Sequence, residues 1–261
     1  MEVESFLIDN VYFLVEGHTL ALMRGPKGKG VEPADVVVPA RTPQGRMITS
    51  IGPRCCEGHF NKIVLSDRIT SVEPKAFAYS PISTIVWSGN CKIIPEECFM
   101  HTHIEKISNI HNVTKIGHSA FMATNIEVFN WPDECSAIPA KCFYASTIKT
   151  IRNIKHVSDI SEAAFAISSI EEIVWPSACP AIPEGCFAYS NLKSLSNIGN
   201  VTEIETRAFM GSQLDKLDLS SLLSLHIAPV AFAGIEPQKV SFPYYISDDD
   251  LANAFEISAN S

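Results

Sequence analysis

Short apolar triplets recur along most of the chain, and each is followed by a polar turn and then by a small residue next to a phenylalanine. From Phe77 to Phe232 this phenylalanine returns after 22 residues six times in succession and then after 23 residues. A spacing kept over so many copies is typical of a repeat protein whose units stack on one another. The sequence therefore predicts a solenoid in which the role of a residue is set by its place within the repeat.

Each apolar triplet is predicted to be a β-strand. Its first and third residues share one side of the strand, and the middle residue faces the other way. Pro39, Pro132, Pro176 and Pro243 directly follow such strands and mark corners, because proline cannot donate to a β-ladder. The return segment of each unit is too short for a full helix and is expected to be irregular or a single turn. The expected strands are 36–39, 63–65, 85–87, 107–109, 129–131, 151–153, 173–175, 195–197, 217–219 and 240–243.

Neighbouring units alternate in composition, so the true period is 44 residues. Trp87, Trp131 and Trp175 are in phase, and asparagine takes their place in the alternate units. The tryptophans share a side with apolar residues and are expected to point into the core. The asparagines are expected to fill the smaller layers between them, bonded to strand or corner backbone. The alternative is a row of tryptophans on the open face that serves as a platform for a ligand.

Six cysteines follow the same 44-residue period. They occupy places that hold valine or alanine in the alternate units, which favours small buried thiols in the core. A disulfide within one unit, such as Cys179–Cys186, stays open as an alternative and is typical of secreted proteins. The spacing of six residues between the paired cysteines matches no common zinc motif. These cysteines are Cys91, Cys98, Cys135, Cys142, Cys179 and Cys186.

One segment carries a family resemblance most clearly, "LKSLSNIGNVTEIETRAFMGSQLDKLDL" at 192–219. Its pattern resembles the BspA-like leucine-rich repeats of bacterial and protist proteins, and the likeness extends over residues 6–243. The segment "FLIDNVYFLVEGHTLALM" resembles the starting hairpin of that family. The resemblance implies adhesion or binding of a host protein, with a location at the cell surface or outside the cell.

The fold prediction is an α/β solenoid, a leucine-rich-repeat stack of about ten coils with one parallel β-sheet and irregular or short helical turns. We expect one structural domain with an N-terminal capping hairpin at 1–34, the solenoid at 35–243 and a C-terminal cap or tail at 244–261. The Gly-rich basic segment 24–33 is expected to be a hairpin tip. The segment "SDDDLANAF" begins with helix-capping residues and is expected to form a short terminal helix.

Charge and composition narrow the function. The net charge is −9 and the 20 lysines and arginines are scattered, which argues against binding nucleic acid or an anionic membrane. No apolar run approaches the ~20 residues that span a bilayer. The first residues lack a basic region and a continuous apolar stretch, so the sequence by itself predicts a soluble cytoplasmic protein. No Ser/His/Asp or Cys/His set recurs or clusters, so we expect no enzyme activity, no cofactor and no metal.

We expect a non-enzymatic module that binds a protein or peptide through the concave face lined by the strands. The alternative is a structural spacer or a self-assembling scaffold without a dedicated ligand. The chain is expected to be a monomer or a weak homo-oligomer. The candidate binding residues are the outward middle residues of the strands and their charged neighbours: Val86, Ser108, Asn130, Arg152, Val174, Ser196, Asp218, Glu171, Glu172 and Lys193.

Overall fold

The computed structural model describes residues 2–26 and 32–255 and divides the chain into two compact units. Unit 1 contains the described residues up to Ile126 together with Pro132–Cys135. Unit 2 contains Glu127–Trp131 and the described residues from Ser136 onward. Residues 27–31 of the expected hairpin tip lie outside the described residues.

Unit 1 begins with three antiparallel strands. They are β1 (Val3–Ile8), β2 (Val11–Glu16) and β3 (Thr19–Arg24), in the order β1-β2-β3. The first turn is a two-residue loop in which Asp9 and Asn10 both have positive φ, at 47° and 62°. Two successive positive φ values match the right-handed twist of the flanking strands. The strands β5 (Ser50–Ile51) and β6 (Cys56–Glu57) then pair with β3 in parallel, so this hairpin layer leads directly into the coils.

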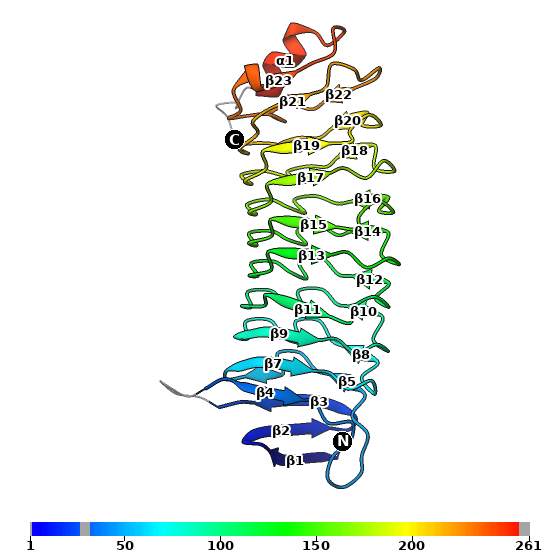
Figure 1. Cartoon of the computed structure of the whole chain (residues 1–261), viewed down its shortest axis with the longest axis vertical. Coiled ribbons are helices and arrows are strands. Elements are labelled where there is room, and N and C mark those ends of the chain that lie inside the picture. Colours follow the sequence, from blue (N-terminus) through cyan, green and yellow to red (C-terminus); the bar gives the residue numbers. More distant parts are fainter. Residues whose placement is uncertain (1, 27–31, 256–261) are drawn as a thin grey trace. The chain divides into compact units, whose positions relative to one another are not determined.

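The coils of unit 1 contribute two rows of parallel strands (Figure 1). The first row contains the longer strands, which the apolar triplets predicted: β4 (Ala34–Val37), β7 (Phe60–Val64), β9 (Ile82–Val86) and β11 (Lys106–Ser108). The second row contains two-residue strands: β5 (Ser50–Ile51), β8 (Ser71–Val72), β10 (Ile93–Ile94) and β12 (Lys115–Ile116).

Unit 2 repeats the same arrangement. Its first row is β13 (Val128–Asn130), β15 (Thr150–Arg152), β17 (Glu172–Val174), β19 (Ser194–Ser196), β21 (Leu217–Asp218) and β23 (Val240–Ser241). Its second row is β14 (Ala137–Ile138), β16 (Asp159–Ile160), β18 (Ala181–Ile182), β20 (Glu203–Ile204) and β22 (His226–Ile227). A short 3₁₀ helix (Pro237–Lys239) precedes β23.

These units are parallel β-solenoids, as the repeat predicted, but the strands form several short sheets in two rows rather than one sheet. The second row lies where the sequence predicted irregular return segments. Backbone N–H and C=O groups that face a neighbouring coil must be paired. Coils that stack in register meet this need with ladder bonds at several places, including the Ile182–Ile204 pair of β18 and β20.

Stacked aromatic rings fill the core. In unit 1 the rings of Phe77, Phe99 and Phe121 stack with centroids 5.5 and 5.8 Å apart. In unit 2 the column contains Phe143, Phe165, Phe187, Phe209 and Phe232, with centroid distances of 5.2–5.8 Å. All three tryptophans are at most 1% exposed. The prediction that they point inward is therefore confirmed.

The asparagines of the alternate coils depart from the prediction in part. Asn153 and Asn197 are exposed, and Asn109 is only half-buried, so they do not fill core layers. Each has a positive φ of 60–62°, a conformation that asparagine adopts more readily than most residues. The Nδ2 of Asn197 donates to the carbonyl of Trp175 at 2.7 Å, and the other two make the same bond one coil back. The expected backbone bond is thus confirmed, whereas the expected burial is wrong.

The segment around each core phenylalanine is a compact turn. In unit 2 the residues two before and two after Phe165, Ala163 and Ile167, have φ values of 50° and 57°. Ser168 lies three residues after the ring, and its buried hydroxyl donates to the Phe165 carbonyl at 2.6 Å. The same local bond recurs at Ser146 and Ser190. The phenylalanine carbonyl also accepts from the backbone N–H of the same serine, at 3.3 Å for Ser168, so the hydroxyl adds a second bond to this turn.

The described residues end in helix α1 (Asp248–Phe255), the short helix that the sequence predicts near the C-terminus. The Ser247 hydroxyl accepts from the Asp250 N–H at 3.2 Å, which is the expected N-terminal cap. The Phe255 ring stacks on Phe232 at 5.6 Å and meets Phe242 edge-on at 5.9 Å. The helix therefore covers the last ring of the phenylalanine column in unit 2.

Candidate functional site

The outward residues of the first strand row form a regular surface in each unit. In unit 1 Val86 lies beside Ser108 in the β9–β11 ladder. In unit 2 Asn130 lies beside Arg152, and Val174 lies beside Ser196. The two residues of unit 1 are half-buried. The outward residues of unit 2 are exposed, with 57% of Val174 accessible.

A column of alternating charge runs beside this row in unit 2. Glu127, Lys149, Glu171, Lys193 and Asp215 occupy the same place in successive coils, 22 residues apart. Lys149 Nζ donates to Glu127 at 2.8 Å, and Lys193 Nζ donates to Glu171 at 2.9 Å. Glu172, on β17, is exposed next to this column. We call the outward row of unit 2 with this column the strand face.

The ion pairs shift the titration of the groups that form them. The hydrogen bond from Lys193 lowers the pKa of the Glu171 carboxyl, and the hydrogen bond to Glu171 raises the pKa of the Lys193 ammonium. The pKa of Lys149 is raised by Glu127 for the same reason. The pKa of Asp218 is lowered because its carboxylate accepts two hydrogen bonds from Ser220. All these groups stay charged near neutral pH, so the strand face presents fixed charges of both signs.

The cysteines belong to the core. All eight are free thiols, and the six that follow the 44-residue period are buried. Burial raises the pKa of Cys179 to about 11, and burial raises the pKa of Cys98 and Cys186 well above the usual value. A thiol with a raised pKa stays protonated, and the protonated form is neither a nucleophile nor a metal ligand. The prediction of small buried thiols is confirmed.

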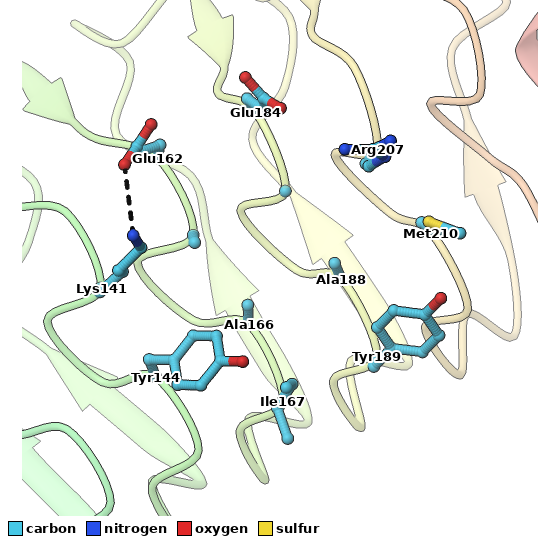
Figure 2. A pocket seen from close by; sticks show the side chains of 12 residues that line it. Lys141, Tyr144, Glu162, Ala166, Ile167, Glu184, Ala188, Tyr189, Arg207 and Met210 are labelled. Atoms are coloured by element: carbon cyan, nitrogen blue, oxygen red, sulfur yellow. Dashed lines mark ion pairs between the residues drawn. The ribbon is translucent and has the colours of Figure 1, made fainter. Parts of the chain in front are cut away.

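A second surface lies on the turns of unit 2, around the core phenylalanines. Figure 2 shows Tyr144 and Tyr189 on either side of Ala166, Ile167 and Ala188. These side chains line an open pocket of about 420 Å³. Its rim carries the charged side chains of Lys141, Glu162, Glu184 and Arg207. We call this surface the turn pocket.

Local structure holds the two tyrosines in place. The turn coils are joined by backbone bonds, including Ile167 N–H to the Ala188 carbonyl at 2.8 Å and Tyr189 N–H to the Met210 carbonyl at 2.7 Å. A Cβ atom on Gly211 would lie 2.7 Å from the Tyr189 ring. The glycine therefore lets this ring lie flat against the next coil.

Sequence reasoning missed the turn pocket. Its residues come from the places one and two positions after the core phenylalanine and from the places two and three positions before it, and the residue type at each place varies between coils. The signal in the sequence was the bulk of Ile167 and Tyr189 at a place that holds Ala145 and Gly211 in the flanking coils. The other residues that line the pocket come from different repeats, so the pocket becomes visible only once the coils are stacked.

Stacked coils of about 22 residues, parallel strand rows and a phenylalanine core define a leucine-rich-repeat solenoid. The family model described as the BspA type leucine rich repeat region matches residues 43–149 and 114–239, with six copies. The chain therefore belongs to the BspA-type leucine-rich-repeat family, and the resemblance found in the sequence is confirmed.

The fold is also supported by one solved structure, the first of the two described here. The chain is similar to a leucine rich cell surface protein from Faecalibacterium prausnitzii A2-165, at 18% identity over 92% of this chain and 76% of that chain, with a TM-score of 0.58. It is also similar to the pneumococcal vaccine antigen PcpA, at 14% identity over 91% and 82% of the two chains, with a TM-score of 0.48. None of the curated proteins matches the chain. At such identities the first likeness supports the fold alone.

The described part of the chain contains neither a cluster of metal ligands nor a membrane-spanning helix. Within residues 2–26 and 32–255, no three histidine, cysteine or acidic side chains gather as a metal site would require. Over the same residues, no helix has the length and apolar character needed to cross a bilayer. The strand face and the turn pocket are the candidate binding surfaces of unit 2.

Proposed function

We propose that this chain is a non-enzymatic binding module that recognises a protein or peptide partner through the strand face. The observation that carries the proposal is the contrast between the two sides of each strand in unit 2. The inward residues are apolar in every coil, whereas the outward residues Asn130, Arg152, Val174, Ser196 and Asp218 differ in every coil. Ladder pairing fixes the spacing of Asn130 beside Arg152 and of Val174 beside Ser196.

A rigid strand face suits binding because few of its side chains and no loops have to be ordered when a partner docks, so little conformational entropy is lost. The charge column adds specificity, since Lys149 and Lys193 alternate with carboxylates at the strand spacing of ~4.8 Å. In unit 1, Val86 and Ser108 offer a smaller and less charged surface of the same kind. Adhesion and a location at the cell surface belong to this proposal, and the similar Faecalibacterium prausnitzii protein is described as a cell surface protein.

The experiment immobilises three forms of the chain (the wild type, a test variant and a matched control) and compares how well each retains a protein or peptide partner. The test variant carries Asn130→Ala, Arg152→Ala and Glu172→Ala on the strand face. The matched control carries Ser158→Ala, Lys155→Ala and Glu203→Ala, which are also exposed in unit 2 but lie off the first strand row and outside the turn pocket. A partner retained by the wild type and the control but lost by the test variant supports the proposal. A partner retained equally by all three forms refutes it, provided that the three melt at the same temperature.

The structural alternative is a spacer or self-assembling scaffold, with the chain otherwise a monomer or a weak homo-oligomer. Sedimentation velocity over a hundredfold range of chain concentration separates these cases. Stable assembly that survives the test substitutions, with no partner captured, favours the scaffold. A monomer that captures a partner through the strand face favours the binding module.

A further inference from the structure

We propose that strand β1 of unit 1 is a dimerisation surface, on which a second copy of this chain adds its own β1 in antiparallel pairing. The inference uses no residue of the strand face or of the turn pocket, so it goes beyond the proposed function and does not rest on it. Three observations support it: the open side of β1, the backbone groups that point to that side, and the order of the exposed side chains.

Strand β1 is the edge strand of the N-terminal sheet in unit 1. It pairs with β2 through all six of its residues in a ladder without a bulge, and no other described strand pairs with it (Figure 1). Edge strands are usually protected by lysine, proline or a bulge, because a regular open edge attracts another strand. The sequence of β1, VESFLI, has none of these three features. The open side of β1 is therefore suited to pairing with a further strand.

The hydrogen bonds of the hairpin show which backbone groups face the open side. Neighbouring residues of a strand direct their N–H and C=O groups to opposite sides, so alternate residues bond to the same neighbouring strand. Gly17 N–H donates to the Glu2 carbonyl at 3.0 Å, which places this carbonyl on the β2 side. The β1–β2 ladder continues in the same register, so the even-numbered residues of β1 bond to β2. The odd-numbered residues, Val3, Ser5 and Leu7, therefore direct their N–H and C=O groups to the open side.

The exposed side chains of β1 are self-complementary in antiparallel pairing. Val3, Ser5 and Leu7 lie on one face of the strand and are exposed, with 60% of Val3 and 65% of Leu7 accessible. If Ser5 lies opposite Ser5 of the second copy, each Val3 lies opposite a Leu7. This register bonds all the outward backbone groups, with two bonds for each residue pair. It also forms two apolar cross-strand contacts between valine and leucine.

The same pattern favours a second copy over an unrelated strand. The order apolar, polar, apolar reads the same in both directions, as pairing about a two-fold axis requires. Glu4 is the charged residue of β1, and it is buried on the other face, where its carboxylate accepts from the Gln44 N–H at 3.4 Å. In the proposed register Glu4 lies opposite Phe6, so two carboxylates do not face each other. Both copies use the same surface, so the assembly closes at two.

The dimer is expected to be weak. Strand β1 contributes six residues from each copy, whereas a stable interface uses ~20–30 residues a side. A dissociation constant on the order of 0.1 mM is therefore expected. Strand β4 is also an edge strand in unit 1, but it is less suited to pairing, because it has four residues and a register shift between Ala34 and Asp35. Strand β4 therefore supplies the control.

The first test is sedimentation velocity of the whole chain from micromolar to millimolar concentration. The wild type should pass reversibly from monomer to dimer and no further. Ser5→Pro removes an outward N–H at the centre of the pairing but no bond of the hairpin, so the dimer should be lost. Leu7→Lys should weaken the dimer about tenfold, because it removes both Val3–Leu7 contacts. The control Val37→Lys on β4 should dimerise as the wild type does, and Val37 is matched to Leu7 by its 64% exposure.

The second test examines the register by cross-linking under a mild oxidant. Ser5→Cys should form a disulfide between two copies, because opposite residues of a bonded pair have Cα atoms ~5.5 Å apart, which is within disulfide reach. Val3→Cys alone should not cross-link, since the two copies of residue 3 would lie ~14 Å apart along the strands. An equal mixture of Val3→Cys and Leu7→Cys should cross-link. The wild type with its eight free thiols is the blank.

These measurements have outcomes that overturn the proposal. A chain that stays monomeric at millimolar concentration overturns it, and so does a dimer that Leu7→Lys leaves intact or that Val37→Lys weakens equally. Cross-linking at residue 3 as readily as at residue 5 also overturns it. Capture of an unrelated extended peptide by a monomeric chain, lost in Ser5→Pro, would assign the edge to another partner and overturn the second copy as its occupant. Leu7→Lys keeps the test decisive if Ser5→Pro fails to fold.

Discussion

The phenylalanine column of unit 2 makes a sharp prediction about stability. Phe165 is fully buried and stacks on Phe143 at 5.8 Å and on Phe187 at 5.7 Å, with the rings within 8° of parallel. Removing a buried phenylalanine ring leaves a cavity and costs about 3–5 kcal/mol. Because the total stability of a domain is only ~5–15 kcal/mol, Phe165→Ala should remove a large part of it.

The measurement is urea unfolding followed by tryptophan fluorescence, since the buried tryptophans report directly on core packing. Phe165→Ala should also lower the melting temperature by about 10 °C, taking ~2–4 °C for each kcal/mol in a chain of this size. Phe165→Leu keeps the apolar volume but loses two ring stacks of ~0.5–1.5 kcal/mol each. It should therefore cost less than Phe165→Ala.

The control is Glu162→Ala, three residues earlier on the same turn. Glu162 is exposed, and its ion pair with Lys141 is long at 3.8 Å. Surface changes of this kind usually shift stability by less than ~0.5 kcal/mol. The stacked column would not be the core that the burial indicates if the free energy of unfolding of Phe165→Ala lay within about 1 kcal/mol of the wild-type value. The same would follow if Phe165→Leu lowered the free energy of unfolding as much as Phe165→Ala does.

Four further outcomes are expected. Cys186→Ala should cost at most ~1 kcal/mol in urea unfolding, because alanine fills the same place at Ala164 and Ala208, whereas Cys186→Ser buries a hydroxyl and should cost ~1–3 kcal/mol. At pH 8 the six buried cysteines of the 44-residue period should resist a thiol reagent, because burial keeps such thiols protonated, with a pKa of about 11 at Cys179. All eight cysteines should react after denaturation, and fewer than eight reactive thiols at that stage would indicate disulfides. Asn197→Ala should cost ~1–3 kcal/mol by removing the bond to the Trp175 carbonyl and a residue suited to positive φ, with Ser194→Ala as an unaffected control. The pKa of Glu171 is lowered in the folded chain, so its ion pair with Lys193 stabilises the fold at pH values above the pKa of the unfolded chain, and this stabilisation disappears as the pH falls through the pKa of the folded chain. Carboxyl-carbon NMR should show a higher pKa for Glu171 in Lys193→Met than in the wild type. An unchanged pKa would contradict the pairing.

Much of the fold follows from the sequence because solenoid positions are fixed by register. The phase of Trp87 and the apolar residues on its side of the strand predict a core position, and Trp87 is buried. The second strand row was not predicted, because two-residue strands such as Ile93–Ile94 show no periodicity of their own. Likewise, nothing in the composition near Asn153 indicates that its φ is positive and its amide lies outside the core.

The candidate site is less predictable for a related physical reason. The outward direction of Arg152 or Val174 follows from strand alternation, and the structure agrees. The ligand that such a residue contacts belongs to another molecule, so the sequence of the repeat does not identify that ligand. The turn pocket combines Tyr144 with Tyr189, which are 45 residues apart in the chain, and only the stacking of the coils brings them to one surface.

The bond from each asparagine to the tryptophan carbonyl of the preceding coil also governs how this chain can change in length. Trp131 with Asn153 and Trp175 with Asn197 are each a matched couple, one donor to one acceptor. Inserting or deleting a single 22-residue coil would set two tryptophan coils or two asparagine coils against each other. Growth by whole 44-residue couples leaves every such bond intact, so an engineer who wishes to lengthen the protein should copy two coils at a time.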